Sequence, residues 1–284
     1  MSTTPRAFIL GHPVAQSRSP MIHGYWLKTL GIQGAYDFKD VPPEGLGAFF
    51  AGLRQEGYVG GNVTAPHKTA VIPYLAGIDE AASAIGAVSV IWTEDGRYVG
   101  GNADAYGFLT NLDDVHPGWD KGGGRVALVL GAGGASRAAV YALLQRGFDV
   151  HIANRTLARA KDLARDFGPQ AHAHAWDEAT ALLPQVDLLV NATSLGMAGK
   201  APLDFDISGL KRDAIVYDVI SVPLETDLVK RARERGHRTA TGLGFLLQQA
   251  GVGFARWFGV TPQVTPDLRR LVEADIIAKT PPAG

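Results

Sequence analysis

Short apolar runs alternate with amphipathic, helix-like segments along the N-terminal third of the chain. The runs that resemble buried strands are residues 7–10, 36–41, 59–63 and 87–92. Segments that resemble helices are residues 20–30 and 46–56, and a further helix is expected to begin at residues 65–68. Asp95-Gly96 is typical of a two-residue hairpin turn. Strands and helices that alternate in this way predict an α/β fold with a mostly parallel sheet.

The strongest strand signal, at residues 125–130, leads into a second alternating region. A glycine-rich turn, Gly131-Ala132-Gly133-Gly134-Ala135, follows this run and precedes a helix-like segment. The elements expected from there on are helices at residues 136–146, 157–167, 226–235 and 245–258 and strands at residues 149–153, 188–191 and 215–219. A strand, a glycine turn and a helix in this order predict a βαβ unit of the Rossmann type.

Length and composition describe a globular chain and exclude several classes of function. The 284 residues are enough for two domains of about 100 to 150 residues each. A formal net charge of -1 gives no field that would hold a nucleic acid. The lack of cysteine excludes disulfides, thiolate metal sites and a cysteine nucleophile. No signal-like segment opens the chain and no apolar stretch reaches about 18 residues, so we expect a cytoplasmic protein that does not bind a membrane.

Two other features are expected to be structural. His172 and His174 have no carboxylate beside them in the sequence, so we expect no metal site there. The five tryptophans are expected to pack in the interior.

The glycine-rich turn and the residues after the next strand together indicate a cofactor. Backbone N–H groups of a glycine turn at a helix start approach a pyrophosphate, whose charge the helix dipole stabilises. NAD-binding versions of this motif carry an acidic residue at the end of the second strand, whereas Asn154-Arg155-Thr156 stands here. A guanidinium suits a ribose 2′-phosphate, and Arg159 lies one helical turn further on. The sequence therefore predicts NADP rather than NAD.

A series of motifs in a fixed order then identifies the family that the chain resembles. They are Ser17-Arg18-Ser19-Pro20, Asn62 to Lys68 (NVTAPHK), Asn102-Ala103-Asp104, residues 131–137 (GAGGASR), Asn154-Arg155-Thr156, Asn191 to Met197 (NATSLGM) and Gly242 to Gln249 (GLGFLLQQ). With these motifs the chain resembles the shikimate dehydrogenase family over nearly its whole length. The resemblance implies the reversible, NADP-dependent reduction of 3-dehydroshikimate to shikimate in aromatic amino acid biosynthesis.

The resemblance also implies an architecture. It divides the chain into a substrate-binding domain, residues 1–103 and 242–284, and a Rossmann-type NADP-binding domain, residues 104–241. A C-terminal helix is expected to return to the first domain. The chain is expected to act on a small cyclic polyhydroxy acid as a monomer or a homodimer.

Family motifs assign roles to individual residues. Reduction of a ketone needs a hydride and a proton for the developing alkoxide, and the resemblance implies Lys68 and Asp104 as the catalytic pair. The residues implied in substrate binding are Ser17, Ser19, Asn62, Thr64, Ser89, Asn102, Ser221 and Gln249. Those implied in cofactor binding are Gly131, Ala132, Gly133, Gly134, Ala135, Asn154, Arg155, Thr156, Arg159, Thr193, Ser194, Met197, Val219 and Gly242. Ser19 is also expected to cap the helix that begins at Pro20.

The chain departs from the family pattern around the expected substrate pocket. Ser89 and Ser221 stand where Asn and Tyr are usual, and Ala103 and Thr241 stand where Thr and Asp are usual. Ala65 is smaller than the customary Val or Ile. Because Lys68, Asp104 and the cofactor turn are kept, the chemistry is expected to persist while recognition changes.

Two alternatives to shikimate turnover follow. One is a dehydrogenase of the same family that acts on quinate, aminoshikimate or a less hydroxylated cyclic ketone. The other is a non-catalytic, NADP-binding sensor on the same scaffold. A phosphoryl-transfer enzyme is excluded because Lys-Ser/Thr does not follow the glycines, as a P-loop requires.

Overall fold

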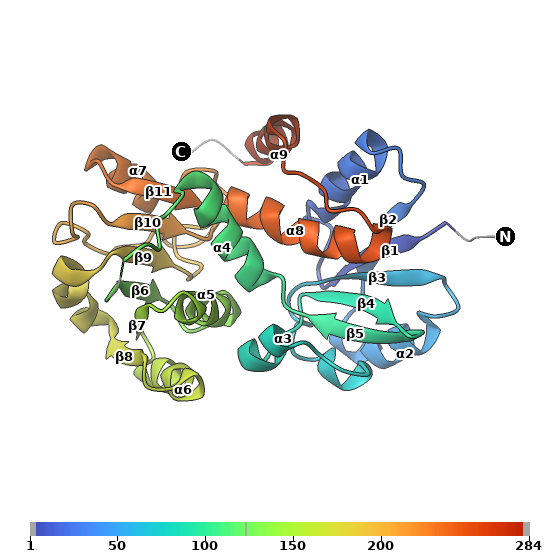
Figure 1. Cartoon of the computed structure of the whole chain (residues 1–284), viewed down its shortest axis with the longest axis horizontal. Helices are drawn as coiled ribbons and strands as arrows, with labels where there is room; N and C mark the ends of the chain where they lie inside the picture. Colours follow the sequence, from blue (N-terminus) through green and yellow to red (C-terminus); the bar gives the residue numbers. More distant parts are fainter. Residues whose placement is uncertain (1–3, 123, 281–284) are drawn as a thin grey trace. The chain divides into compact units, whose positions relative to one another are not determined.

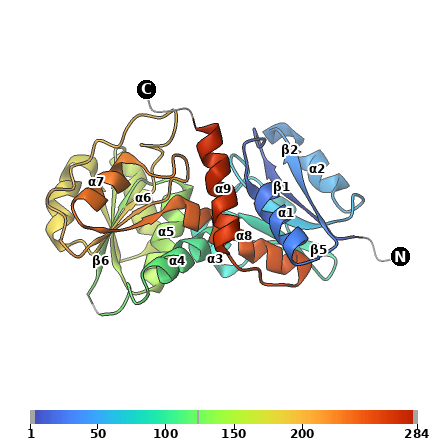
Figure 2. The same ribbon diagram turned by 90° about the horizontal axis from the view of Figure 1, so that it is seen from above.

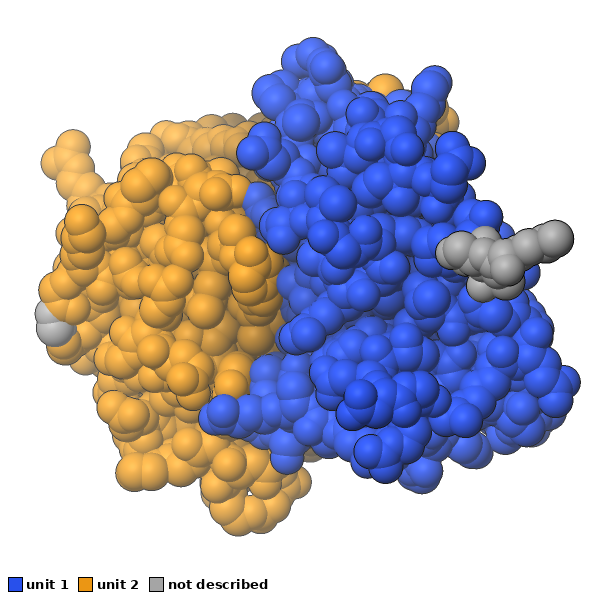
Figure 3. Space-filling view, turned by 45° about the vertical axis from the view of Figure 1, so that its right-hand side comes forward, with its two compact units in different colours: residues 1–103, 247–272 blue, residues 104–246, 273–284 orange. Residues whose placement is uncertain are grey.

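The computed structural model describes residues 4–122 and 124–280. It contains two compact units, one of residues 1–103 and 247–272 and the other of residues 104–246 and 273–284 (Figure 3). Each unit is built around one β-sheet, and helices lie beside both sheets (Figure 1). The α/β class predicted from the alternation of elements is therefore confirmed.

The first unit holds a five-stranded sheet in the order β2-β1-β3-β4-β5. Its elements are β1 (Arg6–Gly11), α1 (Ser19–Thr29), β2 (Ala35–Asp40), η1 (Pro43–Gly45), α2 (Leu46–Gly52), β3 (Tyr58–Val63), η2 (Ile72–Tyr74), α3 (Glu80–Ile85), β4 (Val90–Glu94) and β5 (Arg97–Gly101). Strand β1, which has a neighbour on either side, is apolar on both faces. Phe8 and Leu10 pack in one core, and Ala7 packs on the opposite face with Trp257. Helix α1 lies over β1 and β2 (Figure 2).

Three features of this unit differ from the expectations. The sheet is mixed rather than mostly parallel, because β4 runs antiparallel to both β3 and β5, to the latter through the Asp95-Gly96 hairpin. The helix expected from residue 65 does not form; the chain makes turns there, and Pro73, which has no N–H to donate, would interrupt a helix that began at residue 65. The short segment η2 ends where Leu75 takes an extended conformation. Ser19 is the first residue of α1 rather than its cap, and Ser17 Oγ accepts a hydrogen bond from Ser19 N at 3.2 Å.

The second unit holds a six-stranded, fully parallel sheet in the order β11-β10-β9-β6-β7-β8. Its elements are α4 (Asp104–Val115), β6 (Val126–Leu130), α5 (Gly134–Gln145), β7 (Asp149–Asn154), α6 (Leu157–Phe167), β8 (Ala171–Ala175), η3 (Trp176–Gln185), β9 (Leu188–Asn191), β10 (Ile215–Asp218), α7 (Asp227–Glu234) and β11 (Arg238–Thr241). Helices α8 (Gly242–Phe258) and α9 (Pro266–Lys279) follow. Helices α4 and α5 pack side by side (Figures 1 and 2).

Strand order in this sheet creates a binding edge. From β6 the chain moves outward through β7 and β8, then returns to the other side of β6 as β9 and continues outward again. The carboxyl ends of β6 and β9 are therefore neighbours whose following segments run to opposite sides. In parallel sheets, ligands bind at such a switch point. The strands β8 and β11, which were not expected from the sequence, complete the two edges of the sheet.

A fully buried histidine lies in the interior of the first unit. His23 has no exposed surface and stacks on Tyr36, with ring centroids 4.2 Å apart, among Trp26, Phe254 and Trp257. Its Nε2 lies 3.2 Å from Asn62 Oδ1, and its Nδ1 has no hydrogen-bond partner among the residues that the structure describes. Burial lowers the pKa of His23 from 6.5 to about 3. The imidazole therefore stays neutral in the folded protein at neutral pH.

We predict that His23 makes the protein sensitive to acid. Below pH 6.5 the unfolded chain binds a proton at His23 that the folded protein does not bind until about pH 3, so the free energy of unfolding falls as the pH falls across that window. The contribution is about 1.4 kcal/mol per pH unit. Urea unfolding between about pH 6 and about pH 4 should show a shallower pH dependence in His23→Gln, whose amide still donates to Asn62. Parallel curves for the two proteins would contradict a neutral His23.

Candidate functional site

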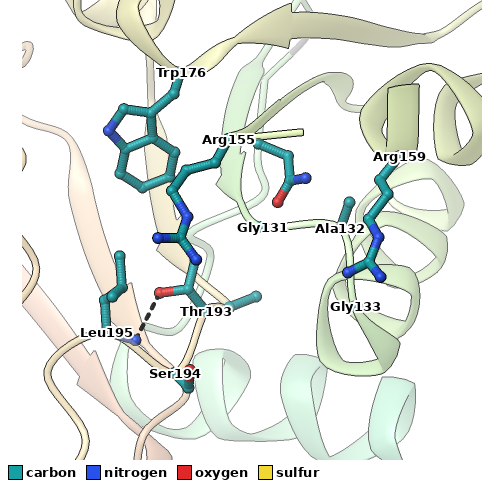
Figure 4. Close-up of a pocket in the computed structure, with 11 residues that line it drawn as sticks. Gly131, Ala132, Gly133, Arg155, Arg159, Trp176, Thr193, Ser194 and Leu195 are labelled. Atoms are coloured by element: carbon teal, nitrogen blue, oxygen red, sulfur yellow. Dashed lines mark hydrogen bonds between the residues drawn. The ribbon is translucent and has the colours of Figure 1, made fainter. Parts of the chain in front are cut away.

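A pocket of about 250 Å³ lies in the second unit, at the carboxyl ends of β6, β7 and β9. The residues that line it are Gly131, Ala132, Gly133, Asn154, Arg155, Arg159, Trp176, Ala192, Thr193, Ser194 and Leu195 (Figure 4). All of them belong to one unit: the residues after β6 and β9 lie at the switch point of its sheet, and the others lie at or after the ends of β7 and β8. The structure thus brings together most of the residues that the sequence assigned to the cofactor.

The glycine turn lines this pocket, and the backbone at Gly131 restricts that position to glycine. Gly131 has a φ of +109°, and a Cβ on it would lie 3.0 to 3.1 Å from Ser136 Oγ, Ala192 O and Thr193 Cγ2. A Cβ on Gly133 or Gly134 would meet no atom within 4 Å, so the backbone there is open to a ligand. Helix α5 begins at Gly134, and its unpaired N–H groups favour an anion.

Two arginines give the pocket its charge. Arg155 follows β7 directly, and Arg159 is in the first turn of α6, whose N-cap is Thr156. Within residues 4–122 and 124–280, neither guanidinium forms an ion pair, whereas the nearby Arg137 is bound by Asp166 at 2.8 Å. No carboxylate lines the pocket, and the end of β7 carries Asn154, whose Nδ2 donates to Thr156 O at 2.9 Å. The site is therefore suited to a doubly charged phosphate.

A buried polar network holds the opposite wall. Asn191 Oδ1 accepts hydrogen bonds from N and Oγ1 of Thr193, at 3.1 and 2.7 Å, and Asn191 Nδ2 donates to the Asp218 carboxylate at 3.2 Å. Asp218 in turn accepts from Ile220 N at 3.0 Å and Thr226 Oγ1 at 2.7 Å. Burial raises the pKa of Asp218. These interactions fix both the Thr193 segment and the loop after β10.

Val219, Gly242 and Met197 lie near that loop. A Cβ on Gly242 would overlap the backbone of Val219 and Ile220, so only glycine permits this approach. Ala198 N donates to Val222 O at 3.0 Å, which holds the segment of Met197 against the same loop. Ser221 lies in the loop and is half-buried, and Thr241 ends β11, where its carbonyl accepts from Asn111 Nδ2 at 3.1 Å.

A separate polar cluster occupies the first unit. Ser17 Oγ lies 3.2 Å from Ser19 Oγ, and Tyr36 Oη donates to Asn62 Oδ1 at 2.7 Å. His23 also bonds to this Asn62 oxygen, so Asn62 has its amide N–H groups left to offer, one of them 3.4 Å from Ser89 O. Thr64 follows β3, where its N–H donates to Leu10 O at 2.9 Å. Gln249 lies half-buried on α8.

Hydrogen bonds attach the segments of Lys68 and Asp104 to two adjacent residues, the first to Val88 and the second to Ser89. Val88 N donates to Lys68 O at 2.7 Å. Ser89 N donates to Gly101 O at 2.9 Å, and Ser89 Oγ accepts from Ala103 N, directly before Asp104, at 2.8 Å. The side chain of Asn102 donates to Ala87 O at 2.9 Å. The serine that replaces the usual asparagine is therefore buried and holds the backbone that leads into Asp104.

Several residues of these clusters were missed at the level of sequence. Tyr36 and His23 carry no motif of their own, and Asp218 reads as an ordinary strand residue. Asn191 was visible as the first residue of the NATSLGM motif, but its role depends on Asp218, a residue far away in the sequence. Trp176 follows a strand, β8, that the alternation did not predict.

The described residues offer neither a metal cluster nor a membrane span. No group of three or more His, Cys, Asp or Glu side chains among them is arranged to hold a metal ion. None of the helices in the described ranges is both long and apolar enough to cross a membrane.

Comparisons with known proteins agree in both units. The model of the shikimate dehydrogenase substrate binding domain matches residues 9–91, and that of shikimate / quinate 5-dehydrogenase matches residues 120–198. The shikimate dehydrogenase (NADP(+)) of Azorhizobium caulinodans is 57% identical over 275 residues, which are 96% of this chain and 98% of that protein. The same enzyme of Brucella abortus is 51% identical over 280 residues, 97% of this chain and 96% of that protein.

A solved structure is also similar along its whole length. Shikimate 5-dehydrogenase from Thermus thermophilus, in complex with NADP(H) and shikimate, has a TM-score of 0.82 and 33% identity, and the match covers 96% of this chain and 100% of that one. Together with the glycine turn, the two arginines of the pocket and the polar cluster of the first unit, these matches show that the chain belongs to the shikimate dehydrogenase family.

Proposed function

We propose that the chain catalyses the reversible, NADP-dependent reduction of 3-dehydroshikimate to shikimate, a step of aromatic amino acid biosynthesis. The observation that carries the proposal is the nucleotide pocket: a glycine turn at a helix start, with two arginines unpaired among the described residues and no carboxylate at the end of β7. The relatives that match over nearly the full chain are named for the same activity.

The residues of the pocket fit NADP. The backbone of Gly131, Ala132, Gly133, Gly134 and Ala135 would hold the pyrophosphate, since no Cβ fills the space above Gly133 and Gly134. Asn154, Arg155, Thr156 and Arg159 would hold the 2′-phosphate. Thr193, Ser194, Met197, Val219 and Gly242 would flank the nicotinamide half. When bound, the reduced cofactor supplies the hydride.

Lys68 and Asp104 serve as the catalytic pair in this proposal. The Lys68 ammonium donates a proton to the substrate oxygen as negative charge develops on it, and Asp104 orients the ammonium and accepts from a ring hydroxyl. Support comes from the Val88-Ser89 segment, which hydrogen-bonds to the backbone of Lys68 and to the residue before Asp104.

Substrate recognition is assigned to the first unit and to the loop after β10. Ser17 and Ser19 offer hydroxyl donors to the substrate carboxylate. The residues assigned to the ring hydroxyls are Asn62, Thr64, Ser89, Asn102, Ser221 and Gln249. The division into a substrate domain, residues 1–103 and 242–284, and a cofactor domain, residues 104–241, belongs to the same proposal. A cytoplasmic location and a monomeric or homodimeric state stay predictions.

Loss of the Lys68 ammonium should slow the chemical step. Lys68→Ala should lower kcat by about 10²- to 10⁴-fold, because the proton donor is lost, while NADP binding is unchanged. Steady-state rates and calorimetric titration with NADP measure the two effects. Lys28→Ala, at the exposed end of α1 in the same unit, is the control. A protein that binds NADP, turns over no member of a substrate panel and is indifferent to Lys68→Ala would be a sensor rather than an enzyme.

Arg155 is expected to distinguish NADP from NAD through the 2′-phosphate. Arg155→Ala should weaken NADP binding by about ten- to a hundredfold and leave NAD binding nearly unchanged, because a charge-assisted hydrogen bond to the phosphate is lost. Arg165→Ala on the same α6 helix, where the arginine is exposed and paired with Asp162, is the matched control. Equal losses for NADP and NAD would place Arg155 elsewhere in the site.

A panel of cyclic alcohols distinguishes shikimate from the alternative substrates. Ser221 in place of tyrosine, and a Ser89 hydroxyl already bonded to Ala103 N, favour a pocket with fewer polar contacts to the ring than is usual. We nevertheless expect the highest kcat/KM for shikimate in a panel with quinate, aminoshikimate and a less hydroxylated cyclic alcohol, because the catalytic pair and the serine pair are retained. A higher value for any other compound would move the assignment to that substrate.

A further inference from the structure

One aromatic side chain enters the nucleotide pocket where the sequence predicted only packing. Trp176 is the first residue of η3, directly after β8. Strand β8 is an edge strand, separated by β7 from β6, which precedes the glycine turn. It is half-buried and lines the pocket together with Arg155. The expectation that all tryptophans serve packing alone does not account for this position.

The indole is held in place by the core of the second unit. It packs edge to face against Phe205, with ring centroids 5.6 Å apart and an interplanar angle of 71°, and contacts the core of the second unit. Ala175 N donates to Glu178 Oε2 at 2.9 Å, which fixes the start of η3. The part of the ring that faces the pocket is therefore supported by contacts that need no ligand.

The two ends of the pocket differ in chemistry. Arg159 enters beside Ala132 and Gly133, where the start of α5 and the bare glycine backbone favour phosphate groups (Figure 4). Trp176 and Arg155 lie at the other end, above Thr193 and Leu195 (Figure 4). That end offers a large flat apolar surface next to a guanidinium plane, a combination suited to an aromatic heterocycle rather than to an anion alone.

We infer that Trp176 forms the wall against which the adenine ring of the cofactor lies. A purine gains free energy from an aromatic face regardless of its hydrogen-bonding edge. Trp176 is thus a specificity-determining residue for the base half of the cofactor. The inference rests on the proposed NADP dependence.

The test separates the base from the phosphates. The two probes are adenosine 2′,5′-bisphosphate and ribose 2,5-bisphosphate, which lacks the base, each titrated by calorimetry into the full-length protein. Trp176→Leu keeps an apolar contact to Phe205 without an aromatic face. It should weaken binding of the adenosine probe about tenfold, leave the ribose probe unchanged, and raise the KM for NADP without lowering kcat. Trp176→Phe should recover most of the loss.

A second tryptophan of the same unit provides the control. Trp119→Phe removes a buried tryptophan of the same unit that does not line the pocket, and should alter neither titration. An equal loss of both probes in Trp176→Leu would mean that Trp176 only supports the fold, and no loss of either would mean that the base lies elsewhere; each overturns the inference. If the unaltered protein binds neither probe, the proposed NADP function fails and the inference fails with it.

Discussion

The close approach of the chain at Gly131 is the constraint on which the nucleotide pocket depends. Strand β6 is buried at the centre of a parallel sheet, and its last turn must bring Gly131 against both Ser136 and the end of β9. The φ of +109° and the short space around the missing Cβ leave glycine as the residue that fits. This contact sets the distance between the start of α5 and the Thr193 segment, and thereby the width of the pocket.

Charge at the pocket is arranged for binding rather than for folding. Arg137, beside the glycine turn, is neutralised by Asp166, whereas Arg155 and Arg159 have no acidic partner among residues 4–122 and 124–280. Two cations that share one hollow repel each other, and an anionic ligand relieves that repulsion. The buried Asn191–Asp218 network stabilises the facing wall at fixed geometry, so the ligand meets a surface that is already ordered.

In the first unit, hydrogen bonds between neutral groups order the polar side chains. Asn62 Oδ1 is saturated by Tyr36 and His23, which orients its amide toward Ser89 and leaves N–H groups as the donors of the cluster. His23 stays neutral because it is fully buried and enclosed by aromatic rings. The hydroxyl of Ser89, where the family usually has asparagine, accepts a hydrogen bond from the backbone before Asp104. This hydrogen bond ties the residue directly before β4 to the segment that leads from β5 into α4.

The sequence by itself determined the α/β class, the glycine turn, the arginines after β7 and the family motifs, because each of these depends on local spacing or on a backbone conformation that one residue type favours. It misjudged the helix after residue 65 and did not reveal β8 or β11, since short strands and turns at the edge of a sheet carry little periodic signal. Only the tertiary structure decided that Trp176 faces the pocket, that Asp218 orders Asn191, and that Tyr36 and His23 share Asn62. These contacts join residues from different strands and helices, and their geometry exists only once the sheets have formed and buried them.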